Sequence, residues 1–334
     1  MVDYVHGWLG DGSRWITYEE PINFLPNFRN PCWQHRKNKT AIRCLPYFYL
    51  AGFPKCGTTD LYERIFLHPG TAAGTIKENY WMIKARFQLP GINSLDYYAT
   101  NFFESATSKI IASVKNGFHH IITGDGTPST IWQHEYWRLI PGNECCSEPR
   151  LVTAQYIKHV YPGSKFIVLL RDPTERLISD YFCFRHPVSL QTFELEVERV
   201  VKMYETCFGQ RSERSCFYDI TFARESNLIH LMCGLYYIAI NDWLKVFPRE
   251  QFLFIPFQDY ARHLGRELKR VYSFLGLDPL PDDVMQRIVN RTTSNKGTDK
   301  PKLAAKTIEI LKKFYRPFNV KLASLLADDR FLWF

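Results

Sequence analysis

The sequence predicts an α/β protein with three layers, in which helices cover both faces of a mostly parallel central sheet. Residues 165–170 form a continuous apolar run, as expected of a parallel strand that is buried on both faces. Residues 47–51 form a second such run and lead into a turn that contains a glycine. Helical patterns alternate with these strands along the chain, which is typical of this fold class.

A chain of 334 residues is long enough to bury one large core, so we expect a single α/β domain from 44 to 334. Residues 1–43 are rich in tryptophan, proline, asparagine and glycine, and they show no sustained hydrophobic period. We therefore expect them to form an irregular N-terminal wrap around the domain.

The strand at 47–51 precedes a predicted helix at 57–67, which has acidic residues in its first turns and ends at a His-Pro-Gly sequence. The strand at 165–170 precedes a helix that carries Arg176 and Ser179. The other predicted elements, in chain order, are a strand at 120–124, a helix at 153–160, a long amphipathic helix at 228–247, a strand at 251–256, and helices at 264–275 and 302–315.

The net charge of +8 indicates a polyanionic partner, and nucleic acid, acidic polysaccharide and a membrane surface agree with that sign equally well. The 42 basic residues are scattered and form no arginine-rich arm. The best apolar segment, 228–240, has about 13 residues, fewer than the roughly 18–20 that a membrane helix needs. No signal peptide follows Met1, so we expect either a cytosolic protein or a chain that starts after a membrane anchor.

The nine cysteines are too scattered for a small disulfide scaffold, and no pair has the CxxC spacing of a metal site. Cys207 and Cys216 bracket a polar segment, and the pair is either a disulfide or two unlinked thiols. A disulfide that closes so short a loop would contribute about 2–3 kcal/mol. Glycosylation sequons at Asn38 and Asn290 favour a secretory lumen, although only weakly, because such triplets are common by chance.

The segment after the first strand has the composition of an anion-binding turn. Its residues are Lys55, Cys56, Gly57, Thr58 and Thr59. Backbone N–H groups at a helix start lack partners and carry partial positive charge, and a glycine lets an anion approach closely. The lysine precedes the glycine, unlike the Walker A order, so a nucleoside-triphosphate site with bound Mg²⁺ is disfavoured. The alternative is an ordinary strand-to-helix turn.

A second candidate anion site follows the strand at 165–170. Arg171 ends that strand and Ser179 lies two helical turns later, so both side chains could reach one phosphate. Ligands of open α/β sheets bind at this edge. Arg176 is an alternative ligand, or it forms a structural ion pair with Asp172 or Glu175.

Together, these two motifs resemble the sulfotransferases that use PAPS (3′-phosphoadenosine 5′-phosphosulfate). In that family the first motif holds the 5′-phosphosulfate and the second holds the 3′-phosphate. The segments 234–237, 243–248 and 274–277 are similar to the Golgi carbohydrate branch. The segments 27–33 and 313–319 are similar to the N-acetylgalactosamine 4-sulfate 6-O-sulfotransferases, and this likeness extends from about 24 to 334.

The resemblance implies a P-loop-like sulfotransferase fold, PAPS as co-substrate and no metal. It implies sulfation of the 6-hydroxyl of N-acetylgalactosamine 4-sulfate residues in chondroitin or dermatan sulfate, hence an acidic glycosaminoglycan partner and no nucleic acid. Relatives are type II membrane proteins with a lumenal domain in the Golgi, so we expect an anchor outside this sequence. That location favours the Cys207–Cys216 disulfide and a glycan at Asn38.

The resemblance also assigns roles to further residues. Glu78 matches the family's glutamate base. Lys77 would orient the sulfate or hold the Glu78 carboxylate in place. The alternative is that Lys77 and Glu78 form an ordinary surface ion pair. Asp125, with Thr127, matches an acceptor contact and is a second candidate base. Histidine is the base in the cytosolic branch, but His68, His119 and His120 suit ordinary structural positions.

Two further groups of residues are expected near the ligands. Lys296 and Gly297 resemble a late loop that closes over the 3′-phosphate, although their spacing after Arg291 departs from the heparan-type pattern. The acceptor groove would be lined by Trp81, Lys84 and Arg86, because an aromatic face stacks on sugar and cations meet sulfates.

Other functions remain open from the sequence. Within the same class they are a heparan sulfate O- or N-sulfotransferase and a protein-tyrosine sulfotransferase. From other classes they are a P-loop nucleotide kinase and a non-catalytic glycan-binding protein.

Overall fold

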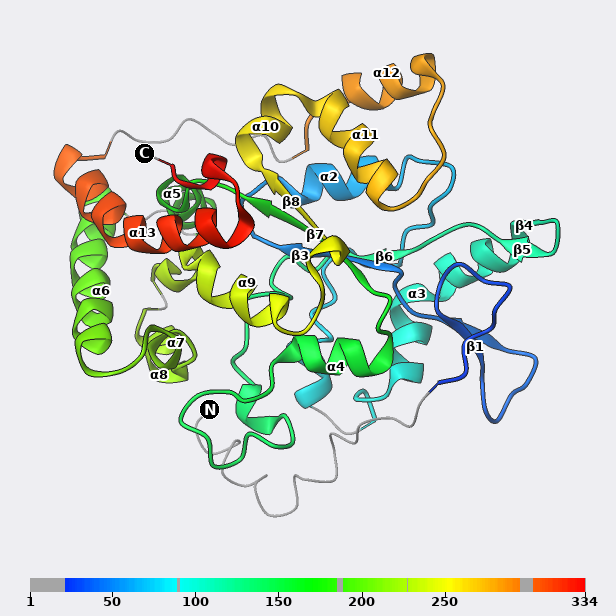
Figure 1. The fold of residues 1–334 in the computed structure, drawn as a ribbon, viewed down its shortest axis with the longest axis horizontal. Coiled ribbons are helices and arrows are strands. Elements are labelled where there is room, and N and C mark those ends of the chain that lie inside the picture. Colours follow the sequence, from blue (N-terminus) through cyan, green and yellow to red (C-terminus); the bar gives the residue numbers. More distant parts are fainter. Residues whose placement is uncertain (1–21, 89–90, 185–188, 227, 295–302, 334) are drawn as a thin grey trace.

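The computed structural model describes residues 22–88, 91–184, 189–226, 228–294 and 303–333. Its central sheet has four strands, all parallel, in the order β6-β3-β7-β8. Their bounds are Gly124–Asp125 for β6, Phe48–Gly52 for β3, Lys165–Leu170 for β7 and Phe252–Pro256 for β8. Helices flank the sheet, so the predicted three-layer α/β class is confirmed (Figure 1).

The two middle strands are parallel because the segment between them crosses back over the sheet. Residues 166–170 of β7 are all buried, and so is every residue of β3, which explains their continuous apolar sequence. The predicted strand at 120–124 is wrong in its bounds, because β6 consists of Gly124 and Asp125 only. A Cβ on Gly124 would lie 2.4 Å from the Phe48 ring, so this glycine lets β6 approach β3.

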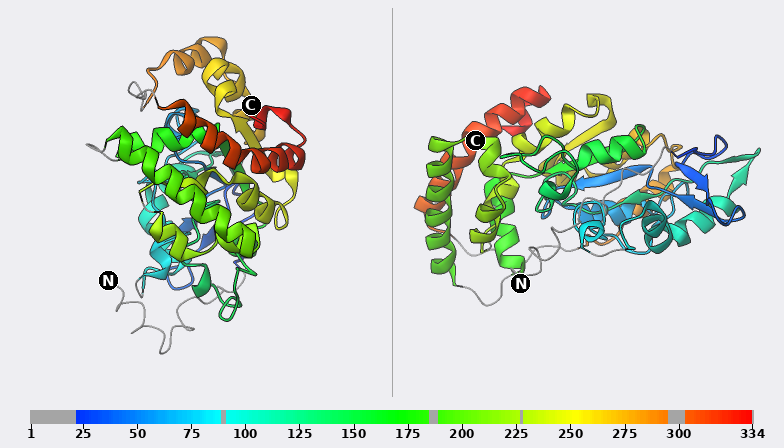
Figure 2. Two further views of the ribbon diagram at one scale, coloured as in Figure 1. Left: turned by 90° about the vertical axis from the view of Figure 1, so that its left-hand side faces the viewer. Right: turned by 90° about the horizontal axis from the view of Figure 1, so that it is seen from below.

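In Figure 1, helices α2, α10, α11 and α12 lie above the strands, and α4 and α9 lie below them. Helices α6 and α13 form one end of the molecule, and the hairpins β1–β2 and β4–β5 form the other (Figure 2). The bounds of the longer helices are Thr58–Ile65 for α2, Leu95–Ala112 for α3, Thr153–Val160 for α4, Pro173–Phe184 for α5, Leu190–Gln210 for α6, Tyr236–Leu244 for α9, Leu264–Phe274 for α11, Asp282–Asn290 for α12 and Ala305–Leu326 for α13. The shorter elements are α7 (Glu213–Phe217), α8 (Ile220–Glu225), α10 (Phe257–Arg262), β4 (Val114–Lys115), β5 (Phe118–His119) and the 3₁₀ turn η4 (Leu231–Gly234).

The predicted long helix at 228–247 is wrong. The chain forms η4 and then α9, because side chains take the carbonyl groups that a continuous helix would use. Arg176 donates to the carbonyl of His230 (2.7 Å), and Tyr315 donates to the carbonyl of Leu231 (2.8 Å). The Tyr315 ring also packs against Gly234, where a Cβ would lie only 2.7 Å away.

The predicted helix at 302–315 ends too early. Helix α13 continues to Leu326 and contains Pro317. Helices α3, α6 and α12 were not predicted. Within the described residues, no helix has the length and apolar character to cross a membrane.

The described part of the N-terminal segment contains a short antiparallel hairpin of β1 (Cys32–Gln34) and β2 (Ile42–Cys44). A disulfide joins Cys32 to Cys44 across this hairpin, and the sequence did not predict that pairing. The sequon at Asn38 lies in the exposed turn, where its side-chain oxygen accepts a hydrogen bond from the Thr40 hydroxyl (2.6 Å). Asn290 is exposed at the end of α12.

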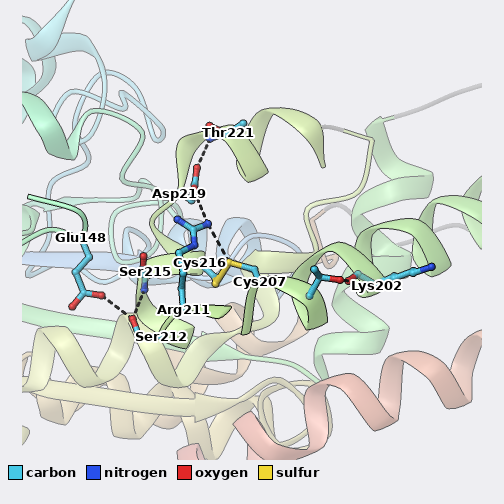
Figure 3. Close-up of a disulfide and its surroundings, with 10 residues drawn as sticks. Glu148, Lys202, Cys207, Arg211, Ser212, Ser215, Cys216, Asp219 and Thr221 are labelled. Carbon is cyan, nitrogen blue, oxygen red and sulfur yellow. Dashed lines mark hydrogen bonds and ion pairs between the residues drawn. A yellow bond between two sulfur atoms is a disulfide. The ribbon is translucent and has the colours of Figure 1, made fainter. Parts of the chain in front are cut away.

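The structure contains the second disulfide, Cys207–Cys216, as predicted (Figure 3). It joins the end of α6 to α7, and both cysteines are buried. Arg211 lies beside it and donates to Asp219 (2.8 Å), which caps α8 (Figure 3). The disulfide therefore fixes the turn between α6 and α7.

Replacing both cysteines by alanine (Cys207→Ala/Cys216→Ala) should lower the free energy of unfolding by about 2–3 kcal/mol, because the unfolded chain gains the entropy of an open loop. Urea unfolding followed by circular dichroism would measure it. Cys145→Ala is the matched control, since this cysteine is exposed and unlinked. An unfolding midpoint equal to that of the control would show that the disulfide does not stabilise the fold.

Candidate active site

The four parallel strands of the sheet end at the same edge, and each is followed by residues that line one cavity of about 1210 Å³. Lys55 follows β3, Arg171 follows β7, Phe257 follows β8, and Ser129 follows β6 by a few residues. This is the edge at which open α/β sheets bind ligands. Of the predicted site residues, the cavity is lined by Lys55, Gly57, Thr58, Thr59, Glu78, Arg171 and Ser179.

The first anion-binding motif forms a tight turn before α2. Gly57 caps this helix with φ of 86°, a conformation that other residues rarely adopt. A Cβ at this position would lie 3.1 Å from the Phe257 ring, so any other residue would also push against this ring. The turn therefore places the start of α2 at the cavity, and the first N–H groups of a helix lack intrahelical partners, as an anion site would need.

Cys56 differs from its neighbours in this turn, because its side chain is fully buried rather than in the cavity. Burial raises the pKa of its thiol to about 11, so the sulfur stays protonated and unreactive. Any contact of this residue with a ligand would therefore come from its backbone.

The second anion-binding motif lies beside the first. The Arg171 guanidinium donates to the carbonyl of Lys55 (3.4 Å), forms an ion pair with Glu175 (2.8 Å) and lies over the Phe257 ring (4.8 Å). Ser179, on α5, lines the same cavity. The two motifs are thus on the same edge of the sheet, which is the arrangement that one nucleotide with phosphates at both ends requires.

Arg176 is fully buried and does not line the cavity. The predicted structural ion pair of Arg176 was with Asp172 or Glu175, and both of these predictions are wrong. Arg176 pairs with Asp180, one helical turn later (3.3 Å). Its role in α5 is therefore structural.

Glu78 lies at the cavity wall between two donors. Lys77 donates to one carboxylate oxygen and Tyr80 donates to the other (2.5 Å). Both Glu78 and Tyr80 line the cavity. The pair Lys77–Glu78 is partly buried, with side-chain exposures of 17% and 33%, so it differs from an ordinary solvated surface pair.

Asp125 is 3% exposed, and its carboxylate is surrounded by donors. One oxygen accepts from Asn79 (2.7 Å) and Tyr98 (2.6 Å), and the other accepts from the backbone of Thr127 (2.7 Å). Three hydrogen bonds already hold this carboxylate, so it is poorly placed to contact an acceptor hydroxyl. Thr127 is likewise buried, and neither residue lines the cavity.

The predicted acceptor contacts of Trp81 and Arg86 are wrong, because both side chains are core residues. The Trp81 indole is fully buried, stacks on Tyr98 and donates to a backbone carbonyl. Arg86 is 3% exposed and lies 3.8 Å from the centre of the Tyr156 ring. Lys84 is exposed and does not line the cavity.

The remaining candidates are the predicted late-loop residues and two histidines. Lys296 and Gly297 lie outside the described residues. His68 is buried against the carbonyl of Asp278 (2.9 Å), and His119 stacks on Phe28, so both are structural, as expected.

The sequence did not predict the role of Asp60, which lines the cavity on the first turn of α2. It pairs with Arg64 (2.7 Å) and accepts hydrogen bonds from Tyr260 on α10 (2.6 Å) and the backbone of Ser294 (3.1 Å). Burial raises its pKa, but these donors outweigh burial and the pKa lies below its ordinary value. Asp60 thus ties the anion-binding turn to α10 and to the chain after α12.

The sequence also missed two further groups of residues that form parts of the cavity wall. Residues of one wall follow β6 and are Pro128, Ser129, Trp132, Gln133, His134 and Glu135. Residues of the other wall lie in or next to α7, α8 and η4 and are Phe217, Tyr218, Asp219, Ile220, Ser226, His230 and Met232. No spacing rule connects segments that lie so far apart in the chain.

A family profile described as "Sulfotransferase domain" matches residues 46–319. The chain is 31% identical to carbohydrate sulfotransferase 15 of Homo sapiens, over 94% of this chain and 66% of that protein. It is 34% identical to the Mus musculus protein of the same name, over 87% of this chain and 55% of that protein, so it spans only part of these relatives.

Among solved structures, a sulfotransferase from Alicyclobacillus acidocaldarius has the same fold, with a TM-score of 0.53 and 23% identity, over 86% of this chain and 97% of that chain. The family profile covers most of this chain, and its match includes both anion-binding motifs. The resemblance inferred from those motifs is confirmed: the chain belongs to the sulfotransferase family.

Proposed function

We propose that this protein transfers a sulfuryl group from PAPS to the 6-hydroxyl of N-acetylgalactosamine 4-sulfate residues in chondroitin or dermatan sulfate. One observation carries the donor assignment: the Lys55 turn and Arg171 lie side by side in one cavity, with the Arg171 guanidinium 3.4 Å from the Lys55 carbonyl. The relatives named carbohydrate sulfotransferase 15 support the choice of a carbohydrate acceptor. The net charge of +8 agrees with an acidic glycosaminoglycan and does not require nucleic acid.

On the donor side, the turn before α2 would hold the 5′-phosphosulfate, while Arg171 and Ser179 would hold the 3′-phosphate. The bond between sulfur and the bridging oxygen breaks as the acceptor oxygen attacks in line, and negative charge grows on that bridging oxygen. The Lys55 ammonium and the N–H groups of Gly57 and Thr58 would stabilise this charge. The leaving group is 3′-phosphoadenosine 5′-phosphate (PAP).

On the acceptor side, Glu78 would take the proton of the attacking hydroxyl. Lys77 and Tyr80 hold its carboxylate at the cavity wall, so the base would be oriented before the acceptor binds. The scheme needs no metal ion. Groups of three or more histidine, cysteine or acidic side chains that could hold a metal are not found in the described part of the chain.

The test is to incubate the protein with radiolabelled PAPS and a panel of chondroitin 4-sulfate, dermatan sulfate, unsulfated chondroitin and heparan sulfate, followed by disaccharide analysis. We expect label on the 6-position of 4-sulfated galactosamine. Label confined to heparan disaccharides would contradict the acceptor. Glycan binding without turnover, or consumption of ATP without PAPS, would contradict the activity itself.

Arg171→Ala should weaken PAP binding about 10–100-fold, because a charged hydrogen bond to the 3′-phosphate is lost. Isothermal titration calorimetry with PAP and with AMP would measure the effect, and AMP binding should change little because AMP lacks the 3′-phosphate. Arg287→Ala is the matched control, since this arginine is 72% exposed on α12 and lies outside the cavity. Unaltered PAP affinity would contradict the assignment of the second anion site.

The proposal includes a location in the Golgi lumen and a membrane anchor outside this sequence. Two disulfides and two exposed sequons support an oxidising, glycosylating compartment. Treatment of the secreted or lumenal protein with an endoglycosidase should shift its electrophoretic mobility, and Asn38→Gln should reduce that shift. A full-length protein that remains cytosolic would contradict the location.

A further inference from the structure

A histidine outside the predicted site is held in the cavity by a buried carboxylate. The Nδ1 atom of His230 lies 2.7 Å from the carboxylate of Asp180 on α5. The Asp180 side chain is 5% exposed, whereas that of His230 is 45% exposed and lines the cavity. The sequence alone does not predict that these two residues are in contact, because they lie 50 positions apart.

The protonation state of Asp180 determines whether the Nε2 atom of a neutral His230 accepts or donates a hydrogen bond. Burial raises the pKa of Asp180, but the charge of Arg176 and the hydrogen bond from His230 outweigh burial and lower it to about 2. Asp180 is therefore ionised and only accepts hydrogen bonds. In the neutral imidazole the proton lies on Nδ1, and Nε2 keeps a lone pair for a donor in the cavity.

The surroundings of His230 favour an uncharged hydroxyl donor over a phosphate or sulfate. The cavity wall formed by residues 217–232 has no lysine or arginine among its lining residues in the described chain, and it includes the carboxylate of Asp219. Its other lining side chains are aromatic, aliphatic or hydroxyl-bearing, the usual mixture of apolar surface and a few polar groups in a ligand pocket. The positive charge of Arg176 is buried and opposed by Asp180.

We propose that His230 is an acceptor-binding residue whose Nε2 accepts a hydrogen bond from a hydroxyl group of the sugar chain, and that Asp180 is the positioning residue that fixes its orientation. The inference rests on the proposed function and adds a specificity contact on the wall formed by α7, α8 and η4. It leaves proton removal to Glu78. Sugars that lack the hydroxyl, or present it in another orientation, would leave Nε2 unpaired and bind less tightly.

The test measures kcat, the KM of the glycosaminoglycan acceptor and the Kd of PAP for His230→Ala and His230→Gln. We expect His230→Ala to raise the acceptor KM about tenfold, the usual effect of one lost hydrogen bond, with kcat and the Kd of PAP nearly unchanged. Glutamine can accept through its amide oxygen, so His230→Gln should recover part of the loss. His120→Gln is the matched control, because this histidine is exposed and does not line the cavity.

Asp180→Asn should raise the acceptor KM in the same direction, and the double variant with His230→Ala should add little to the single change. If Asp180 were only structural, Asp180→Asn would lower the melting temperature, and its effect on the acceptor KM would be independent of that of His230→Ala. Weakened PAP binding by His230→Ala would overturn the proposal in favour of a donor contact. An altered pH profile of kcat would instead indicate that His230 acts as a base. If His230→Ala changed none of these parameters, the proposal would be rejected. Wild-type protein without turnover on every glycan would instead reject the proposed function.

Discussion

Lys55→Ala is expected to abolish measurable sulfuryl transfer while leaving the protein folded. The lysine lies in the turn before α2 and lines the cavity, where it would meet the bridging oxygen of the donor. Negative charge develops on that oxygen only as the sulfur–oxygen bond breaks, so under the proposed mechanism the ammonium would stabilise the transition state more than bound PAPS. Removing a single donor of this kind lowers kcat by about 10²–10³-fold, so we expect almost all sulfuryl transfer to be lost.

The measurement is transfer from radiolabelled PAPS, together with PAP binding by calorimetry and a thermal unfolding curve. Lys55→Arg keeps the charge and should recover part of the rate. Lys109→Ala is the control, because this lysine is exposed on α3 and outside the cavity. Near-normal turnover by Lys55→Ala would refute the assigned role, and the N–H groups of the turn would then have to supply the stabilisation.

The second large effect is expected for Glu78→Gln, which should lower kcat by about 10²–10⁴-fold, the usual range for a lost base. Glutamine has nearly the same shape as glutamate and can still accept a hydrogen bond from Tyr80, so the cavity wall should keep its form. Donor binding should be spared, because the base acts on the acceptor hydroxyl. The measurement is kcat at saturating PAPS, with the Kd of PAP determined in parallel.

Glu104→Gln provides the matched control, since Glu104 is exposed on α3 and outside the cavity. An unchanged rate for Glu78→Gln would transfer the role to another group. Asp125 would then be tested by Asp125→Asn, although its carboxylate already accepts three hydrogen bonds and the change should chiefly reduce stability.

The parts of the fold and site that the sequence predicted correctly are local. The apolar runs of β3 and β7 and the glycine before α2 are short patterns whose meaning does not depend on distant residues. The parallel order of the strands then brings the Lys55 turn and Arg171 together without further information.

The errors arise where distant side chains decide the outcome. The segment after His230 has helical periodicity, but Arg176 and Tyr315 bind its carbonyl groups and interrupt the helix. Trp81 and Arg86 are residue types found in sugar sites, yet the packing of Tyr98 and Tyr156 places them in the core. The Asp180–His230 pair depends on the contact of α5 with η4, which no single segment encodes.

The network around Asp60 bears on how tightly the donor could be bound. Because Arg64, Tyr260 and Ser294 hold this carboxylate, the turn, α10 and the chain after α12 are linked by protein contacts that need no nucleotide. Little conformational freedom would then be lost on association, and more of the contact energy would appear as affinity. A substitution at Tyr260, which donates to Asp60, lies beside Gly57 and lines the cavity, would consequently loosen the turn and weaken nucleotide capture.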